Sequence, residues 1–391
     1  MFGSFAELND GVELTGERMV AGGDALGHAP DGRVVLIDGA LPGERVEVQI
    51  TSDRSDMLRA RVAAVLDASP DRVTPPCAFA RAGCGGCGWQ HVAPQVQPQL
   101  KLDIVRDALR RIARVDDPPL RDAVPLPPTG YRSTVRALVV DGRAAFRRRA
   151  SHEPITIESC LVAHPLVDDV LRNGRFGEAR EVTVRASVAT RERCLLPDPS
   201  HATIDVADDV QIGSRASVTE VVDGTPLRVS VRSFFQTRPD GATVLARLIR
   251  NAVGPNRTVA DLYCGVGLFA ARLDSPLRVV AVERASSSVR DARHNLRHLP
   301  ARVVRSDVDA FRPEPVEVVI ADPSRRGVGR AGVRTIERTG AGRVVLVSCD
   351  AAALARDVSL LHASGFDLRS VTLVDLFPHT PHIEAVSVLE R

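Results

Sequence analysis

Residues 258–283 read TVADLYCGVGLFAARLDSPLRVVAVE. Two short apolar runs, TVADL and RVVAVE, flank a glycine-containing turn, and LFAARL between them has a helical pattern. Strands that alternate with helices in this way are typical of a parallel, doubly wound sheet. We therefore predict a Rossmann-like α/β fold for this part of the chain.

The same alternation continues on both sides of this stretch. Helices are predicted at VLARLIRNAV, SSVRDARHNLRHL and AAALARDVSLL, and strands at VEVVIADPS and RVVLV. The α/β texture begins near Arg232, so we assign residues 231–391 to one domain.

The first 230 residues have a different texture. Residues 8–67 show period-two alternation and Gly/Pro turns, which predicts a small β-barrel of the OB type over residues 1–67. Residues 69–76 read as a linker. A helix is predicted from about Gln97 to Val115, and a mostly β region with a hairpin at Asp141-Gly142 follows in a central domain, residues 68–230.

The composition is that of an ordinary globular protein, with 44% hydrophobic and 26% charged residues. The N-terminus has no signal-peptide pattern, and no apolar run approaches the roughly 18 residues of a membrane span, so we expect a cytoplasmic protein with no membrane partner. In a reducing compartment, an odd total of seven cysteines favours metal binding or catalysis over disulfides.

Charge is distributed unevenly, although the net charge is only +2. Residues 1–67 carry twelve acidic and six basic side chains, whereas residues 131–149 hold six arginines and one aspartate. The arginine-rich segment is either a solvated sheet face or a stripe that contacts RNA. Lys101 is the only lysine beside 50 arginines, which the codon bias of a GC-rich genome explains best.

Acidic residues and glycines follow successive predicted strands. In a doubly wound sheet, ligands bind at the carboxyl ends of the strands. Glycines of the GxG turn let the backbone approach a ligand, and an acidic residue about twenty positions later suits ribose hydroxyls. Carboxylates after three strands suit a nucleoside bearing an amino acid, so the pattern favours S-adenosylmethionine (SAM) over NAD. The residues are Gly265, Gly267, Glu283, Asp307 and Asp322.

A cysteine follows the strand RVVLV and precedes a helix. Cys349 is therefore expected beside a helix N-terminus, which stabilises a thiolate, on the cofactor's side of the sheet. Glu384 lies in FPHTPHIEAVSV near the C-terminus. A thiolate and a carboxylate near a methyl donor suit methylation of a pyrimidine carbon, with the thiolate adding to C6 and the carboxylate removing the C5 proton.

Residues 77–91, CAFARAGCGGCGWQH, place three cysteines in a glycine-rich loop. A disulfide, a zinc ion and an iron–sulfur cluster are all compatible with the loop alone.

The motifs DLYCGVGLFAARL, SFFQTR, ADPSRRG, LVSCDAAALARD and DLFPHTPHIEAV resemble those of the RNA uracil-5-methyltransferase family, in order and over essentially the whole chain. Residues 8–67 are similar to the TRAM domain that precedes the catalytic part in many members. The resemblance implies a class I methyltransferase acting on C5 of a uridine in rRNA or tRNA. We expect a monomer.

The resemblance also implies roles for individual residues. It makes Cys349 the nucleophile and Glu384 the C5 base, and it places Phe234 against the target base. Cofactor contacts fall on Gln236, Tyr263, Glu283, Asp307 and Asp322.

Members of the rRNA type carry a [4Fe–4S] cluster, whose ligands fall here on Cys77, Cys84, Cys87 and Cys160. Their spacings of six, two and 72 intervening residues fit no ordinary zinc finger. We therefore expect the cluster first and zinc second, in a structural role. Cys194 and Cys264 are expected in the core.

The chain departs from the family pattern at several positions. Asp350-Ala351 stands where the family has Asn-Pro, Pro323-Ser324 replaces Pro-Pro, and Leu268 replaces a commonly polar residue. A carboxylate at Asp350 is expected to oppose thiolate formation at Cys349. Two alternatives are therefore a non-catalytic RNA-binding protein with the same fold and a methyltransferase that acts on another RNA atom.

Overall fold

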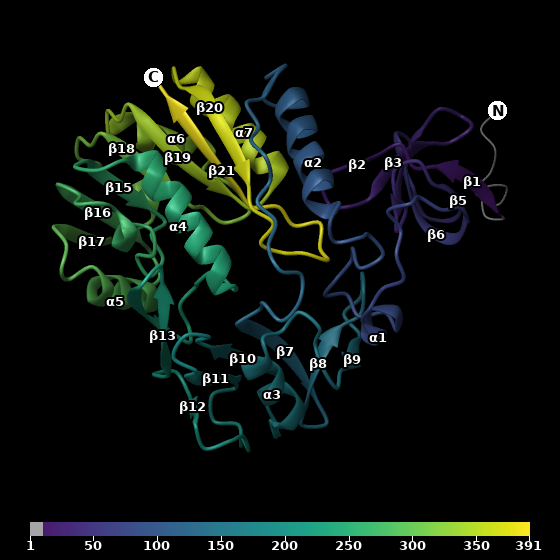
Figure 1. Cartoon of the computed structure of the whole chain (residues 1–391), viewed down its shortest axis with the longest axis horizontal. Helices are drawn as coiled ribbons and strands as arrows, with labels where there is room; N and C mark the ends of the chain where they lie inside the picture. The colour runs from purple at the N-terminus through teal and green to yellow at the C-terminus, as the bar shows by residue number, and fades with distance from the viewer. Residues whose placement is uncertain (1–10) are drawn as a thin grey trace.

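A computed structural model describes residues 11–391 of the chain, in three parts that surround a common centre (Figure 1). The first part is a six-stranded sheet with strand order β1-β5-β6-β4-β3-β2. Alternate side chains of its strands are buried, as the period-two pattern predicted. Its strands are β1 (Val12–Thr15), β2 (Arg18–Met19), β3 (Ala25–His28), β4 (Val34–Asp38), β5 (Arg45–Asp53) and β6 (Met57–Asp67).

The central part is a second six-stranded sheet of order β12-β11-β10-β7-β8-β9, with its own apolar core. The predicted hairpin is confirmed: Asp141 and Gly142 join β7 to β8 with φ of 50° and 69°. Its elements are α1 (Ala78–Arg81), β7 (Thr134–Val140), β8 (Arg143–Arg147), β9 (Pro154–Thr156), α3 (Pro165–Asn173), β10 (Glu181–Ala186), β11 (Arg193–Asp198) and β12 (Val210–Ile212).

The third part contains a seven-stranded sheet of order β17-β16-β15-β18-β19-β21-β20. All neighbouring strands are parallel except β21, which runs antiparallel to both β19 and β20. The predicted doubly wound sheet is therefore confirmed. Its strands are β15 (Thr258–Leu262), β16 (Arg278–Glu283), β17 (Ala301–Arg305), β18 (Val318–Ala321), β19 (Arg343–Ser348), β20 (Asp367–Leu373) and β21 (Ala385–Glu390).

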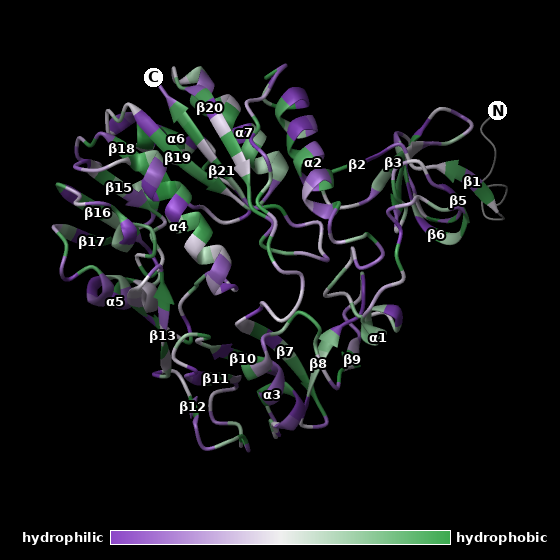
Figure 2. Cartoon of the chain, in the orientation of Figure 1, coloured by the Kyte–Doolittle hydropathy of each residue, from purple (hydrophilic) through white to green (hydrophobic). Residues whose placement is uncertain are grey.

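Both faces of this sheet are covered, which explains why its strands are continuously apolar (Figure 2). One face packs against α2 (Gln97–Arg111), α6 (Gly329–Arg338) and α7 (Ala351–Ala363). The other packs against α4 (Pro239–Val253), α5 (Ser286–Asn295) and the hairpin of β13 (Ser217–Val222) and β14 (Thr225–Ser230). Thus α2 and this hairpin, which lie before residue 231, contribute to the core around the C-terminal sheet.

One predicted helix is much shorter than expected. LFAARL forms only the three-residue 3-10 helix η1 (Ala270–Arg272). The chain turns at once through Ser275, whose φ is 45°, before it enters β16. None of the helices in residues 11–391 is long and apolar enough to span a bilayer.

Candidate active site and cysteine pocket

The predicted cofactor residues gather at one edge of the seven-stranded sheet. Strands β15, β16, β18 and β19 are parallel and adjacent, so their carboxyl ends meet there. Tyr263 follows β15, Glu283 ends β16, and Asp322 follows β18. Asp261 lies one step inside the sheet and is fully buried; its Oδ2 accepts the Ala270 N–H, and its Oδ1 has no partner within residues 11–391.

The turn after β15 has an unusual backbone. Tyr263, Gly265 and Gly267 have φ of 65°, 56° and 85°, a region that glycine adopts freely and a tyrosine rarely does. A Cβ on Gly267 would lie 3.0 Å from Leu296, whereas one on Gly265 would meet only a backbone oxygen at 4.0 Å. The second glycine is therefore needed for packing, and the first leaves open space beside the turn.

Glu283 holds this turn in place. Its Oε2 accepts the Gly265 N–H at 3.1 Å, and its Oε1 accepts the Ala285 N–H at 2.7 Å. Asp307 is the N-cap residue of η2 (Val308–Ala310), and its exposed carboxylate lies 3.9 Å from the Arg284 guanidinium. Glu283 therefore borders the glycine turn and is already engaged with backbone donors, whereas the contact of the Asp307 carboxylate is with Arg284.

The segment SFFQTR crosses the same edge from the other side. Gln236 is buried and donates from Nε2 to Asp322 Oδ2 at 3.5 Å, which brings two predicted cofactor residues together. Phe234 has 66% of its surface exposed, although it is a large apolar residue. An exposed ring next to a polar site can pack against a planar ligand.

A buried carboxylate that sequence reasoning missed fixes this segment. Asp291, on α5, accepts hydrogen bonds from the Ser230 N–H, the Ser230 hydroxyl and the Ser233 hydroxyl at 2.8, 2.8 and 2.6 Å. Arg228 adds a fourth donor at 3.1 Å. Because Ser233 directly precedes Phe234, Asp291 fixes the backbone next to that residue. Asp291 lies in a mostly polar helical segment, so the sequence pattern did not predict that its side chain is buried.

Cys349 and Glu384 lie across a strand pair from each other. In the antiparallel pairing of β19 with β21, Ser348 is opposite Ala385. Cys349 and Glu384 are the next residues of the two segments, just beyond this last pair. Two residues that are 35 positions apart in sequence therefore come to the same sheet edge as Asp322.

The electrostatics of this pair differ from the expectation at the cysteine. Burial, together with the Glu384 and Asp322 carboxyls, raises the pKa of the Cys349 thiol to about 11, although Arg325 acts in the opposite direction. Burial, followed by Asp322, raises the pKa of Glu384 well above its ordinary value. These groups therefore favour the neutral thiol, in opposition to the effect expected of the helix N-terminus. A carboxyl with a raised pKa is a stronger base than a solvated one once it ionises.

The carboxylate of Asp350 has a local role. It is the N-cap residue of α7, and its Oδ1 accepts the Ala353 N–H at 2.8 Å. The departure from Asn to Asp therefore preserves a helix cap, because both side chains are good N-caps.

Sequence reasoning also missed a cation at the site. Arg325, three residues after Asp322, acts on the Cys349 thiol and has Nη2 3.3 Å from Nε2 of His382. His382 packs edge-on against Phe377. The Arg325-Arg326 pair in ADPSRRG could have indicated a cation at the site, but arginines are common throughout this chain.

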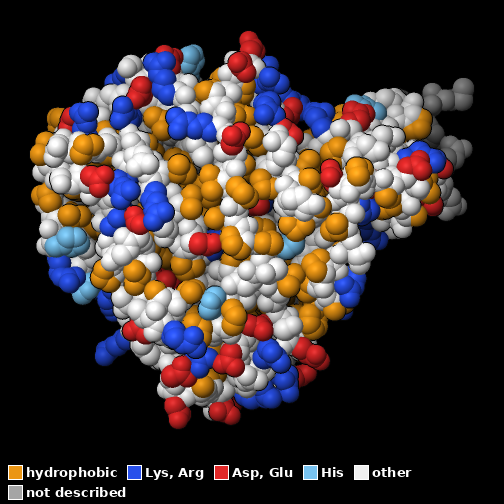
Figure 3. Space-filling view, in the orientation of Figure 1, with side chains coloured by type: hydrophobic (Ala, Val, Ile, Leu, Met, Phe, Trp, Pro, Cys, Tyr) orange, Lys and Arg blue, Asp and Glu red, His pale blue; other side chains and the backbone are white. Residues whose placement is uncertain are grey.

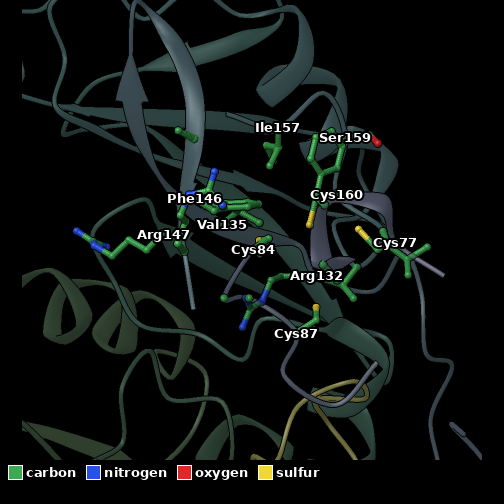
Figure 4. Close-up of a pocket in the computed structure, with 18 of the residues that line it drawn as sticks. Cys77, Cys84, Cys87, Arg132, Val135, Phe146, Arg147, Ile157, Ser159 and Cys160 are labelled. Carbon is green, nitrogen blue, oxygen red and sulfur yellow. The ribbon is translucent and has the colours of Figure 1, made fainter. Parts of the chain in front are cut away.

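The four cysteines predicted to bind metal line one cavity of about 300 Å³ (Figure 4). The cysteine loop is fixed by the arginine-rich segment: Gly85 N–H donates to the Arg147 carbonyl, and Arg149 N–H donates to the Gly83 carbonyl. A Cβ on Gly85 would come within 3.1 Å of this backbone, so the glycine is required there. Cys160 reaches the cavity from beyond β9. The four cysteines that line the cavity are Cys77, Cys84, Cys87 and Cys160.

These thiols surround a space and do not converge on one point. No group of three or more potential ligands in residues 11–391 is close enough to hold a single metal ion. Burial, with smaller contributions from Cys160 and Cys84, raises the pKa of Cys87 to about 12, against the lowering effect of a hydrogen bond with Gln90. Cys194 and Cys264 are buried in the apolar core, as predicted.

Charges of both signs are scattered over the face shown in Figure 3, and hydrophobic side chains gather near its middle. Several arginines of residues 131–149 are engaged within the chain: Arg136 and Arg147 pair with Glu181, and Arg149 pairs with Asp38. They remain 42–70% exposed.

This chain is similar to known proteins in both sequence and structure. Residues 12–63 match the TRAM domain family. The chain is 33% identical to an uncharacterized RNA methyltransferase of Streptomyces avermitilis, covering 94% of this chain and 95% of the relative. It is 32% identical to the 23S rRNA (uracil(1939)-C(5))-methyltransferase RlmD of Methylococcus capsulatus, covering 94% of each.

A solved structure has the same fold over the whole chain. The Pyrococcus abyssi tRNA (uracil-54, C5)-methyltransferase, in complex with S-adenosyl-L-homocysteine, superposes with a TM-score of 0.72 and 21% identity, covering 96% of this chain and 100% of that one. Identity above 30% over nine tenths of the sequence, together with this fold, shows that the chain belongs to the TRAM-containing RNA uracil-5-methyltransferase family.

Proposed function

We propose that this protein transfers a methyl group from SAM to C5 of a uridine in RNA, through a covalent bond between Cys349 and C6. The observation that carries the proposal is the strand register that brings Cys349 and Glu384 to the edge where the glycine turn and Asp322 also lie. An uncharged pyrimidine carbon needs both a nucleophile and a base, and this edge supplies one of each.

Each residue has a defined part in the reaction. Cys349 loses its thiol proton to solvent and its sulfur bonds to C6, so the C5–C6 π electrons become available at C5. Bound SAM would supply the methyl group to C5, with the bond between that methyl group and the sulfonium sulfur broken and S-adenosylhomocysteine left behind. Glu384 then takes the C5 proton, the C5–C6 double bond re-forms, and the bond between C6 and sulfur breaks. Arg325, which favours the thiolate, assists the first step.

The cofactor residues fit SAM. Glu283 fixes the open glycine turn, which lets the ligand approach the backbone, and the partnerless Asp261 Oδ1 is a buried acceptor behind it. Gln236 and Asp322 offer polar groups on the other side of the turn. Tyr263 and Asp307 complete the set, and Phe234 would pack against the target base.

We further propose that Cys77, Cys84, Cys87 and Cys160 hold a [4Fe–4S] cluster. A cavity of about 300 Å³ that is lined by all four cysteines supports this assignment. The cluster would tie the cysteine loop to the segment that carries Cys160, and no catalytic step requires it. The exposed arginines of residues 131–149 border this cavity and would contact RNA phosphates.

The proposal is tested by trapping the adduct. With Glu384→Gln, addition to C6 and methyl transfer can occur, but the C5 proton remains, so a protein–RNA species should persist on a denaturing gel. Cys349→Ala in the same background should abolish that species. A Glu384→Gln enzyme that releases methylated RNA at the normal rate would rule out Glu384 as the base.

A further inference from the structure

The connection between β20 and β21 lies where all three parts of the molecule meet; it is the yellow loop near the centre of Figure 1. We call residues 375–382 the clamped loop. It leads directly to Ile383 and Glu384, so its position determines where the proposed base lies.

Four successive carbonyl oxygens of the clamped loop accept hydrogen bonds from outside it. Arg238 donates to Leu376 at 3.2 Å and Lys101 to Phe377 at 2.9 Å. The Tyr131 hydroxyl donates to Pro378 at 3.1 Å, and the Trp89 N–H donates to His379 at 2.8 Å. Such irregular buried backbone needs partners for each polar group, and here they come from four separate segments.

Lys101 makes the strongest of these contacts. Its ammonium is fully buried, donates to Asp375 Oδ1 at 2.6 Å, and lies 6.0 Å from the centre of the Trp89 ring. A buried ammonium needs a charged partner and further acceptors, and Asp375 and the Phe377 carbonyl supply both. The only lysine of the chain is thus placed beneath both ends of the Asp375–Phe377 turn.

A short chain of contacts connects Lys101 to Glu384. Asp375 directly follows Val374, whose N–H donates to the Glu384 carbonyl at 2.8 Å. On the other side, α2 packs against α7, whose N-cap Asp350 directly follows Cys349. The helix that carries Lys101 therefore contacts the supports of both proposed catalytic residues.

We propose that Lys101, with its partner Asp375, is a positioning residue that holds Glu384 where it can take the C5 proton. This inference rests on the proposed function, because it assigns Lys101 to one step of that reaction. Lys101 touches neither RNA nor cofactor, and it acts only through the clamped loop. Losing the pair should therefore slow proton removal more than methyl transfer.

The two steps can be followed on the same RNA. A transcript with tritium at C5 of its uridines reports proton removal as released tritium, and SAM with a carbon-14 methyl group reports methyl transfer. In Lys101→Met, first-turnover methyl transfer should stay within about threefold of the unaltered enzyme, while tritium release slows at least tenfold. The matched control is Arg111→Met, the same kind of change on an exposed side chain of α2.

A second variant separates the proposed positioning role from a loss of stability. Lys101→Met leaves the Asp375 carboxylate buried and unpaired, whereas Lys101→Met with Asp375→Leu removes both charges and should restore the melting temperature. The double variant should still show the lag, since the tie to the Phe377 carbonyl is lost. Tritium release that keeps pace with methyl transfer in the folded variants, or equal slowing of both steps, would overturn the inference.

Glu384→Gln in the same assay separates this inference from the proposed function. A lag in Glu384→Gln without one in the Lys101 variants would remove only the role of Lys101. Equal rates of methyl transfer and tritium release in Glu384→Gln would remove the proposed base as well.

Discussion

Asp291 offers a quantitative test of how the SFFQTR segment is held. The carboxylate is fully buried on α5 and accepts hydrogen bonds from three donors of Ser230 and Ser233 and from Arg228. Asp291→Ala removes every acceptor at once. The Ser230 N–H cannot turn elsewhere, whereas the two hydroxyls can rotate, and Arg228 is 38% exposed and can be solvated.

The cost follows from these contacts. A hydrogen bond to a charged group contributes about 1.5–3 kcal/mol, and an orphaned buried donor costs about 1–3 kcal/mol. Since the contributions are not additive and two donors can rotate, we expect Asp291→Ala to lower the free energy of unfolding by about 3–4 kcal/mol. Asp291→Asn keeps the volume and one acceptor, so its loss should be about half of that.

Urea unfolding measures this change directly, as a shift of the midpoint at constant slope. Asp274→Ala is the matched control: the carboxylate is 57% exposed, lies 3.7 Å from Arg250, and should contribute less than about 1 kcal/mol. The same Asp291→Ala protein should lose RNA turnover more than SAM affinity, because Phe234 follows Ser233. A loss below about 1 kcal/mol, or unchanged RNA turnover, would refute the reasoning.

Three further predictions concern the catalytic pair and the cysteine pocket. Cys349→Ala should abolish methyl transfer and leave SAM affinity within a few-fold, as measured by calorimetry; retained turnover would exclude the covalent route. Because burial and nearby carboxyls raise the pKa of Cys349 to about 11, the fraction of reactive thiolate should rise between pH 7 and 9. The value of kcat/KM should rise with it, by up to about tenfold per pH unit. A flat pH profile would show that thiolate formation does not limit the rate. Cys160→Ser should lower the iron content of anaerobically purified protein from about four per chain and reduce the melting temperature, since metal-binding energy becomes folding energy; equal iron in both proteins would exclude Cys160 as a ligand.

The sequence predicted much of the site because the relevant residues follow strands. Tyr263, Glu283 and Asp322 come directly after apolar runs, and the carboxyl ends of parallel strands share an edge. The pairing of Cys349 with Glu384 could only be suggested by their residue types, because the antiparallel register of β19 and β21 is a tertiary property.

What the sequence did not predict depends on burial. Asp291 and Lys101 both look like surface residues of amphipathic helices, and only the packing of α5 and α2 shows that each is an anchor. Burial is also the reason why the expected thiolate at Cys349 is disfavoured. A helix N-terminus was visible in the pattern, but the burial that opposes it was not.

The structural unit of catalysis is larger than the predicted methyltransferase domain. Helix α2 covers one face of the seven-stranded sheet with side chains that are fully buried, among them Val105 and Leu109. The first part of the chain also takes part: the Gly23 carbonyl accepts the indole N–H of Trp89, and a Cβ on Gly23 would lie 2.4 Å from Pro381 of the clamped loop. A chain that begins at residue 231 would therefore lose an apolar cover and the supports of Glu384 together. The acidic charge of the TRAM domain is unfavourable for binding phosphates. Its contacts with Trp89 and the clamped loop instead give it a structural role beside the catalytic sheet.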